Sequence, residues 1–504
     1  MAVMATLQDY RDERLRKLAE LKELGIDTYP ADVHRTHMTS EVIDKFDDLQ
    51  GQSVTVAGRI VSIRSFGKLA FVKLRDASGD VQLYLQADSV AALDAARGTL
   101  GMKELRLLDT GDFIEATGEM TTTKTGEKSV GVKELRLLTK ALRPMPEVLT
   151  NKEERFRRRY VDMNVNPEVR ERFVRRSRFW QATRDFLLSE GFVEINVPVL
   201  EHTTGGADAN PFVTHMDALD NQQFYLRISH ELPLKRLLGA GFEKVFDIGP
   251  RFRNENYSDE HLPEHVAMES YAAFQDYNDG MELYERMIKY VAEKTWGTLQ
   301  FKNVNGFEID LSGEWPRVEY ADMMKKEYDV DVFKPDLEQL KGILKREGVE
   351  LDGDVNVNRA LDNVWKLIRK RTAGPIWMIH EPVEISPLAK IDPKDPRVTQ
   401  RFHPVIAGSE LGNGFSELND PVDQLNRFVE QQAMRDSGDD EAMMLDIDYV
   451  EMLEYGMPPA CGWGNSERNF WFFEGVTARE GVPFPQLKHE IDETTKSIYP
   501  DVKL

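Results

Sequence analysis

One stretch near the middle of the chain carries side chains suited to binding a nucleoside triphosphate. Arg253 offers a planar set of donors for an α-phosphate, and its guanidinium stays charged at any working pH. Glu255 and His261 follow with groups that could hold a base or a ribose. Glu269 and Tyr271 stand two positions apart, so on a strand their side chains would point to the same side. A surface hairpin with arginine–glutamate pairs would account for the same residues, so the stretch alone leaves both interpretations open.

Two short apolar runs enclose these side chains. Residues 245–248 predict a strand, and residues 266–271 alternate like a returning strand. The polar segment between them follows neither a helical nor a strand period and is too long for a tight hairpin. Loops of that length in compact domains are usually functional or mobile. We therefore expect two antiparallel strands joined by a long loop.

A second candidate motif, residues 409–420, alternates along a predicted strand. Glu410 falls on one face of that strand, while Asn413, Phe415 and Glu417 fall on the other. Because the two faces cannot both point into one flat pocket, the sequence predicts a bulge at the intervening glycines or a cleft reached from both faces.

Three further segments add single candidates. Residues 456–468 read as a glycine-rich turn from strand to helix, and Arg468 in that turn could meet a phosphate. Gly206 lies in a Thr-Gly-Gly-Ala segment that would let the backbone approach a ligand closely, although a plain turn explains it equally well. Residues 229–232 open a helix that carries Glu231.

The N-terminal part of the chain has a different pattern, in which short strands alternate with turns. The predicted strands cover residues 54–60, 68–75, 81–85, 112–118 and 130–137. With a helical patch near residues 89–97, they fit a small five-stranded barrel of the OB type. Such barrels bind single strands by stacking bases on aromatic side chains, and Phe71 and Tyr84 are available for this. Gln82 and Arg64 could read base edges; a barrel with these aromatics in its core is the alternative.

The composition limits the class of protein. The chain has 504 residues, of which 41% are hydrophobic and 30% are charged, so more than one globular domain is expected. It contains no apolar run long enough to span a membrane and no signal-peptide pattern, and its one cysteine, Cys461, excludes an internal disulfide or a cysteine-cluster zinc site. The net charge of -22 argues against DNA or indiscriminate nucleic-acid binding, but allows RNA bound through local basic patches. We expect a cytoplasmic protein.

These patterns predict an α+β chain in four parts. The parts are an N-terminal helical extension at residues 1–50, the barrel at 51–143, a proline-punctuated linker at 144–166, and a large domain at 167–504 with a helical insertion at about 321–370.

The order of the motifs resembles one family. Phe-Arg-Asn-Glu, His-Leu-Pro-Glu and Met-Glu-Ser-Tyr within residues 252–271 resemble the second signature motif of class II aminoacyl-tRNA synthetases, most closely the lysyl group. The helix and strand at residues 167–200 resemble the first motif, which forms the dimer interface in that family, and residues 456–468 resemble the third. The barrel is similar to the family's anticodon-binding domain. The resemblance covers most of the chain, from residue 54 to 488.

The resemblance implies a fold, a reaction and a set of site residues. It implies an OB barrel joined to a catalytic domain built on an antiparallel sheet flanked by helices, in a homodimer. It implies that L-lysine is activated with ATP to lysyl-adenylate and transferred to the 3′-hydroxyl of tRNA(Lys), with Mg²⁺ present. The implied lysine-binding residues are Gly206, Glu231, Arg253, Glu269, Tyr271, Asn413, Phe415 and Glu417. The implied ATP-binding residues are Arg253, Glu255, His261, His265, Glu410 and Arg468, with Arg253 and Arg468 acting in catalysis, Glu410 and Glu417 holding Mg²⁺, and Arg64, Phe71 and Gln82 contacting tRNA.

Three departures from the family pattern bear on that site. His403 stands where the family usually has a second acidic metal ligand, and because Mg²⁺ prefers oxygen we expect fewer protein-held Mg²⁺ ions. His265 replaces a phenylalanine. The third motif has Ser466 where its last glycine is expected, and a one-residue deletion would place Arg468, rather than Asn469, at the arginine position. A paralogue that lysylates a protein, or a catalytically silent regulator that binds tRNA or amino acid, therefore stays open as an alternative.

Overall fold

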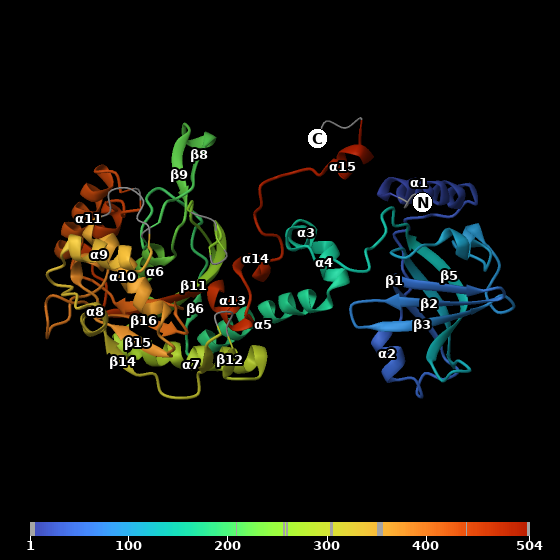
Figure 1. Cartoon of the computed structure of the whole chain (residues 1–504), viewed down its shortest axis with the longest axis horizontal. Coiled ribbons are helices and arrows are strands. Elements are labelled where there is room, and N and C mark those ends of the chain that lie inside the picture. Colours follow the sequence, from blue (N-terminus) through green and yellow to red (C-terminus); the bar gives the residue numbers. More distant parts are fainter. Residues whose placement is uncertain are drawn as a thin grey trace. The chain divides into compact units, whose positions relative to one another are not determined.

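The computed structural model describes residues 6–207, 209–255, 258, 261–302, 306–349, 356–439 and 441–500. The chain divides into two compact units (Figure 1). One contains the chain up to Thr150 together with the segment from Lys488 onward, and the other contains Asn151–Leu487. These boundaries differ from the expected ones in two places. The second unit already begins at Asn151, inside the segment 144–166 that was expected to be a linker, and the residues from Lys488 onward group with the first unit.

The first unit is built on the predicted barrel. Five strands close in the order β1-β2-β3-β5-β4. Their bounds are β1 (Ser53–Phe66), β2 (Leu69–Arg75), β3 (Asp80–Gln86), β4 (Phe113–Thr122) and β5 (Lys128–Thr139), with short 3₁₀ turns η1 (Ala95–Arg97) and η2 (Glu104–Leu107) between β3 and β4. Alternate residues of β2 and β3 point into the barrel core, as the period-two pattern predicts.

Helices α1 (Leu7–Glu23) and α2 (Thr39–Asp44) belong to the same unit, because Leu21 and Val42 are fully buried in the barrel's own hydrophobic core. The C-terminal segment, with α15 (Glu493–Ile498), contacts α1, where the Arg11 guanidinium lies 5.4 Å from the ring centre of Tyr499. The expected N-terminal extension is therefore an integral layer of the first unit.

The second unit is built on a nine-stranded sheet. Its strands are ordered β14-β15-β16-β18-β19-β11-β10-β6, with β17 paired to β16. The bounds are β6 (Val193–Glu194), β10 (Lys244–Phe252), β11 (Glu264–Ala273), β14 (Arg317–Glu319), β15 (Ile376–Ile379), β16 (Arg401–Ile406), β17 (Ser409–Glu410), β18 (Asn413–Ser416) and β19 (Ala460–Ser466). The predicted antiparallel arrangement holds in the middle of the sheet, whereas both edge pairs, β6–β10 and β14–β15, are parallel. The sheet is therefore mixed, because each edge strand returns to its partner through intervening helices.

Helices cover both faces of this sheet, and they form two separate hydrophobic cores with it. One core, around Phe179, Tyr284, Trp463 and Phe470, receives α5 (Pro167–Ser189), α7 (Tyr277–Trp296) and α13 (Glu467–Glu474). The other core receives α6 (Glu231–Gly239), α11 (Pro421–Asp436) and α12 (Ile447–Tyr455), which pack around Tyr271 and Phe415. Shorter helices are α3 (Lys152–Arg157), α4 (Arg159–Val165) and α14 (Ala478–Gly481).

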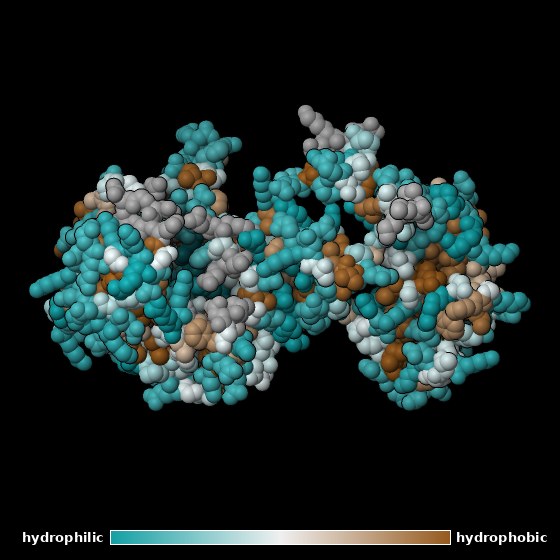
Figure 2. Space-filling view, viewed as in Figure 1, coloured by the Kyte–Doolittle hydropathy of each residue, from teal (hydrophilic) through white to brown (hydrophobic). Residues whose placement is uncertain are grey.

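The helical insertion forms where the sequence predicts it. Helices α8 (Tyr320–Tyr328), α9 (Leu337–Arg346) and α10 (Val357–Lys370) share a small core that also takes in Met378 of β15 and Val405 of β16. The remaining elements are two small sheets, β12 (Gln300–Lys302) with β13 (Glu308–Asp310), and β7 (Leu200–Glu201) with β9 (Gln222–Leu226) and β8 (Val213–Met216), and the short turns η3 (Asp217–Leu219) and η4 (Val383–Ile385). The visible surface is mainly hydrophilic with scattered apolar patches (Figure 2). None of the helices in the described ranges is both long and apolar enough to cross a lipid bilayer.

Candidate active site

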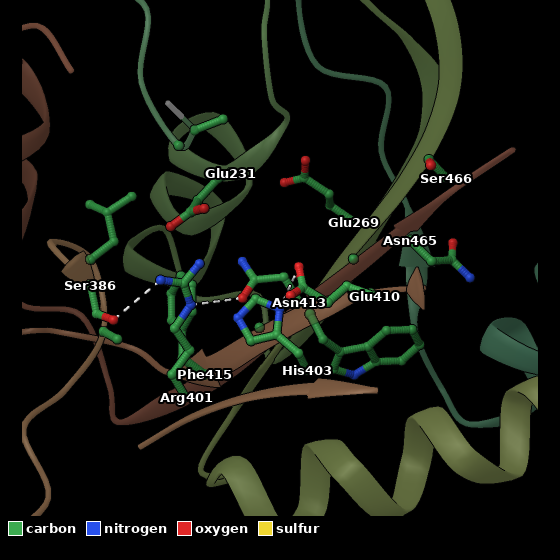
Figure 3. Close-up of a pocket in the computed structure, with 18 of the residues that line it drawn as sticks. Glu231, Glu269, Ser386, Arg401, His403, Glu410, Asn413, Phe415, Asn465 and Ser466 are labelled. Carbon is green, nitrogen blue, oxygen red and sulfur yellow. Dashed lines mark hydrogen bonds and ion pairs between the residues drawn. The ribbon is translucent and has the colours of Figure 1, made fainter. Parts of the chain in front are cut away.

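A cavity of about 330 Å³ opens on the sheet of the second unit, on the side covered by α6. Most of the predicted substrate residues line it (Figure 3). Those that do are Gly206, Glu231, Arg253, Glu269, Tyr271, Glu410, Asn413, Phe415 and Arg468. Segments that are far apart in the sequence therefore meet at one site, as the motif order implies.

The strand register explains how they meet. Glu269 of β11 pairs with Gly464 of β19, which in turn pairs with Asn413 of β18. Two residues earlier on β19, Gly462 likewise pairs with Tyr271 of β11 on one side and with Phe415 of β18 on the other, which gives a second row across the sheet. Directly opposed residues share a face of the sheet, so both rows point into the cavity.

The glycines of the third motif make this arrangement possible. A Cβ atom on Gly462 would lie 2.2 Å from the Tyr271 ring, and one on Gly464 would lie 2.9 Å from Cγ of Glu269. Any larger side chain at either position would displace a predicted substrate residue.

A break in the 409–420 segment places side chains from both predicted strand faces in the cavity. β17 ends at Glu410 and β18 begins at Asn413, so Leu411 and Gly412 interrupt the alternation. Glu410 and Asn413 consequently both line the cavity. This is the irregularity that the sequence predicts at the glycines.

The carboxylate of Glu269 is fixed by hydrogen bonds from three donors. Its Oε1 accepts hydrogen bonds from the Ser229 hydroxyl at 2.8 Å and the His230 backbone N–H at 3.2 Å, and its Oε2 accepts one from the Tyr271 hydroxyl at 3.0 Å. Burial raises the pKa of Glu269, but the nearby His230 and Arg251 and the hydrogen bond from Ser229 together bring it below the ordinary glutamate value. Glu269 is therefore a fixed anion. Sequence reasoning missed Ser229, for which the only signal is its place two residues before Glu231.

Glu417 lies behind the cavity wall and does not line it. The Lys235 ammonium is 2.6 Å from Oε2 of Glu417 and 2.8 Å from Oε1 of Glu231, and all three side chains are buried. Lys235 stands one helical turn after Glu231 on α6, a spacing at which side chains meet, so the sequence contained a signal for this pair.

Two polar side chains of the long loop, those of Glu255 and His261, do not line the cavity. Glu255 and His261 are exposed, and residues 256, 257, 259 and 260 lie outside the described part of the loop. His265 accepts a hydrogen bond from Nε of Arg251 at 2.7 Å and does not line the cavity. Burial together with Arg251 and Arg253 lowers the pKa of His265 well below its ordinary value. The expected ATP contacts of these three residues are thus not assembled around this cavity.

Two arginines that the sequence did not single out do line it. The guanidinium of Arg251 lies 3.8 Å from Oε1 of Glu269. Nε of Arg401 donates to Oδ1 of Asn413 at 2.9 Å (Figure 3). The NH1 group of Arg401 lies 2.8 Å from Glu381. Each is therefore tied to a residue of the site.

The third motif brings both candidates for its arginine position, Arg468 and Asn469, to the cavity. β19 runs to Ser466, whose hydroxyl caps α13 by accepting from the Arg468 N–H at 3.3 Å. Glu467 pairs with Arg176 at 2.7 Å, and Nδ2 of Asn469 donates to the Tyr284 hydroxyl at 3.0 Å. Of the two candidates, only Arg468 adds a cation to the site.

The two carboxylates expected to hold Mg²⁺ do not fit that role. Magnesium takes oxygen ligands in a near-octahedral arrangement, so a ligating carboxylate must turn a lone pair toward the ion without a cation of the protein competing for it. Glu410 accepts from Nε1 of Trp365 and lies 3.3 Å from the Arg369 guanidinium. Glu417 does not line the cavity, and its Oε2 is paired with Lys235. Burial raises the pKa of Glu410, but His403, Arg369 and Trp365 bring it down to about 2. Across the described ranges, the structure brings together no cluster of three His, Cys, Asp or Glu residues suited to a metal ion.

On the barrel, the predicted tRNA residues share the outer face. Arg64 of β1 pairs with Phe71 of β2, and Phe71 pairs with Tyr84 of β3. The rings of Phe71 and Tyr84 are stacked with centres 5.4 Å apart, and neither residue is buried. Gln82 lies on the same face and donates to the Ser129 hydroxyl at 3.0 Å. The alternative that these aromatics fill the barrel core is therefore excluded.

The comparisons with known proteins agree with this architecture. Residues 151–488 match the family described as "tRNA synthetases class II (D, K and N)", and residues 54–138 match "OB-fold nucleic acid binding domain". The chain therefore belongs to the class II tRNA synthetases of the D, K and N group. Among curated relatives it is similar to the "Lysine--tRNA ligase" of Thermotoga maritima, with 42% identity over 96% of each chain. It is also similar to proteins of that name from Fervidobacterium nodosum, with 40% identity over 96% of this chain and 95% of the relative, and Moorella thermoacetica, with 43% over 90% and 91%.

Proposed function

We propose that this protein is a lysine–tRNA ligase. It activates L-lysine with ATP to lysyl-adenylate and releases pyrophosphate, and it then transfers the lysyl group to the 3′-hydroxyl of tRNA(Lys). The observation that carries the proposal is that two carboxylates, Glu231 and the fixed anion Glu269, line the same cavity as the ring of Phe415. Carboxylates beside an aromatic wall complement an ammonium group on an alkyl stem. An aspartyl enzyme would instead need a cation at the side-chain end of its pocket.

The lysine ammonium groups would be bound by Glu231 and Glu269, with Tyr271, Asn413 and Phe415 around the stem. Gly206 would face the substrate through its backbone, since a Cβ atom there would lie 2.7 Å from Cβ of Glu231. Glu417 would not contact the substrate, and it would instead hold Lys235 in place behind the cavity wall.

The triphosphate would lie against Arg253 and Arg468. In the first step, the lysine carboxylate attacks the α-phosphate in line and pyrophosphate leaves. No protein nucleophile is needed, so catalysis consists of positioning the reactants and offsetting charge. Arg253 serves the α-phosphate and Arg468 the outer phosphates. Magnesium would enter on the phosphates of ATP, where its charge offsets theirs.

On the barrel, we propose that Phe71 stacks on an anticodon base and that Arg64 and Gln82 contact its neighbours. A stacked aromatic pair on an exposed sheet face is the usual platform for single-stranded nucleic acid. The tRNA partner would thus be held by the first unit while its 3′ end reaches the second. The cytoplasm is where such a reaction would be carried out.

We also propose that the chain works as a homodimer. Large apolar side chains stay exposed on and next to the helix and strands of the first motif: Leu188 at 49%, Val193 at 47% and Leu200 at 46%. Light scattering of the purified protein should give about twice the chain mass, and Val193→Lys should lower it toward the mass of one chain.

The decisive experiment is ATP–pyrophosphate exchange with lysine, aspartate or asparagine. Exchange should depend on lysine alone, and lysylation should then require tRNA. Lysine-dependent exchange with transfer to a protein instead of tRNA would favour the protein-lysylating paralogue. No exchange with any of the three amino acids, together with retained tRNA or lysine binding, would favour the silent regulator.

A further inference from the structure

Glu410 lines the active-site cavity, yet its carboxylate is held from the helical insertion. Nε1 of Trp365 donates a hydrogen bond to its Oε1, and NH1 of Arg369 lies 3.3 Å from its Oε2. Trp365 and Arg369 are one turn apart on α10, so they present their donors from one face of that helix. Both oxygens of Glu410 are therefore engaged by two side chains of the insertion.

The donors themselves are fixed in place. Trp365 is 3% exposed and packs edge-to-face against Tyr320 of α8, with ring centres 5.5 Å apart. Val364 and Ile368, which flank the two donors on α10, are buried in the insertion's core. Only 11% of the Arg369 side chain is exposed. The packing of Trp365 holds its donor beside Glu410 unless α10 shifts, and the low exposure of Arg369 limits where its guanidinium can move.

On its other side, Glu410 faces a line of side chains in which acidic and basic groups alternate. Nδ1 of His403 lies 3.8 Å from Glu410, and Nε2 of the same ring lies 3.5 Å from Glu381, which pairs with Arg401 at 2.8 Å. The two ring nitrogens face different carboxylates on opposite sides. Glu381, His403 and Glu410 therefore cannot converge on a single ion.

We propose that Trp365 and Arg369 are positioning residues that hold Glu410 within the protein's own ion-pair network, so that Glu410 does not serve as a ligand for Mg²⁺. The two carboxylates of the line are matched by two guanidinium groups, those of Arg369 and Arg401. The arginines that line the cavity then supply the fixed positive charge, and divalent metal is present only as the ion that ATP carries. This rests on the proposed function in one respect, namely that ATP binds in this cavity. It also gives the helical insertion a role in the site.

The first test counts metal ions. Mn²⁺ is titrated into the full-length protein with lysine and a non-hydrolysable ATP analogue, and bound Mn²⁺ is counted by its paramagnetic resonance signal. We expect one Mn²⁺ per bound nucleotide, and none without nucleotide. A second Mn²⁺ per site that is lost in Glu410→Gln would overturn the proposal.

The second test changes the donor. Arg369→Gln should free Oε2 of Glu410, so that the variant binds one additional Mn²⁺ per site. Raising the free Mn²⁺ concentration should then tighten binding of the ATP analogue at least tenfold more in the variant than in the wild type. Arg369→Lys keeps the charge and should restore the wild-type count. Lys370→Gln removes the same charge from the next, exposed position of α10 and is the matched control.

Thermal unfolding of each variant separates misfolding from a change at the site. An Arg369→Gln protein that stays folded, and whose metal count and metal dependence equal those of Lys370→Gln, would refute the role of Arg369. If Arg369→Gln proves unstable, Trp365→Phe tests the same link, because it removes the indole N–H donor and keeps an aromatic ring against Tyr320, and it too should allow extra Mn²⁺. Failure of lysine-dependent exchange in the wild type would reject the proposed function, whereas the Mn²⁺ count with nucleotide would still decide this proposal.

Discussion

The Lys235 ammonium is 2.6 Å from Oε2 of Glu417, and both side chains are completely buried. Lys235 also lies over the rings of Phe415 and Tyr449, 5.6 and 5.5 Å from their centres. Burial lowers the pKa of Lys235, but Glu231 and Glu417 more than reverse this and raise it well above its ordinary value. A resident ammonium thus occupies, behind the cavity wall, the same kind of carboxylate-and-aromatic cage that we propose for the substrate.

Lys235→Met should therefore leave two buried carboxylates without their cation. Breaking a buried pair by removing one partner costs about 3–5 kcal/mol, so the free energy of unfolding should fall by that order. Denaturant unfolding measures it. The double variant Lys235→Met/Glu417→Gln should regain part of the loss, because the stranded charge is gone. Additive losses in the double variant would show that the two side chains are not coupled.

Glu269→Gln should sharply weaken lysine activation while it leaves the KM for ATP nearly unchanged. The amide keeps the shape but removes the charge that faces the substrate ammonium. The value of kcat/KM for lysine in pyrophosphate exchange should fall by a factor that corresponds to about 3–5 kcal/mol of lost interaction energy. Ser229→Ala removes one hydrogen bond to this anion and should cost about 1.5–3 kcal/mol in the same assay. Unchanged lysine dependence in Glu269→Gln would refute the assignment.

Local pattern was sufficient for the elements that carry their own signal. The two strands of the second motif, the five barrel strands and the strand-to-helix turn before Arg468 follow from alternation, turn residues and glycine placement. The boundary at residue 151 was missed although it has a local signal. Asn151 caps α3 by accepting from the Glu154 N–H at 3.0 Å, and an asparagine before a charged helical run is a helix start.

Pairing partners could not be read from local pattern. The parallel edges of the sheet depend on which strand lies beside which, and alternation contains no such information. The place of Glu417 was predicted by extending an alternation that ends with β18 at Ser416. The link from Trp365 and Arg369 to Glu410 joins residues more than forty positions apart and has no sequence period, so only the folded insertion reveals it.

Phe71→Ala should weaken tRNA recognition without harming amino-acid activation. Loss of one stacked base costs about 1–3 kcal/mol, so the KM for tRNA should rise while pyrophosphate exchange without tRNA stays the same. Tyr10, an exposed aromatic on α1 of the same unit, provides the control as Tyr10→Ala, which should change neither. Equal damage to both reactions would mean that Phe71 supports the fold instead of binding tRNA.

Glu201 should make stability depend on pH. Burial raises its pKa to about 8, and its Oε2 atom has no hydrogen-bond partner among the described residues. Between about pH 4.5 and 8 the folded protein keeps this proton while the unfolded chain releases it, so rising pH favours unfolding through this group. Glu201→Gln should therefore be more stable than the wild type, by on the order of 2–4 kcal/mol at pH 8 and by little at pH 4.5. Glu243→Gln, at an exposed position, is the control, and a stability difference that does not grow with pH would contradict the assignment.

Arg468 and Asn469 make the sharpest test of the third motif, because they are neighbours in the first turn of α13 and both line the cavity. Only the guanidinium can offset phosphate charge. Arg468→Ala should raise the ATP requirement and slow adenylate formation on the order of a hundredfold, a cost typical of losing one preorganised charge-stabilising donor. Asn469→Ala removes the hydrogen bond to Tyr284, so it should lower stability by about 0.5–1.5 kcal/mol and leave the KM for ATP unchanged. Exchange kinetics over a range of ATP concentrations, with unfolding measured on the same samples, distinguish the two effects. If Asn469→Ala alone impaired ATP use, the ungapped register of the motif would be the correct one and Arg468 would be a surface cation.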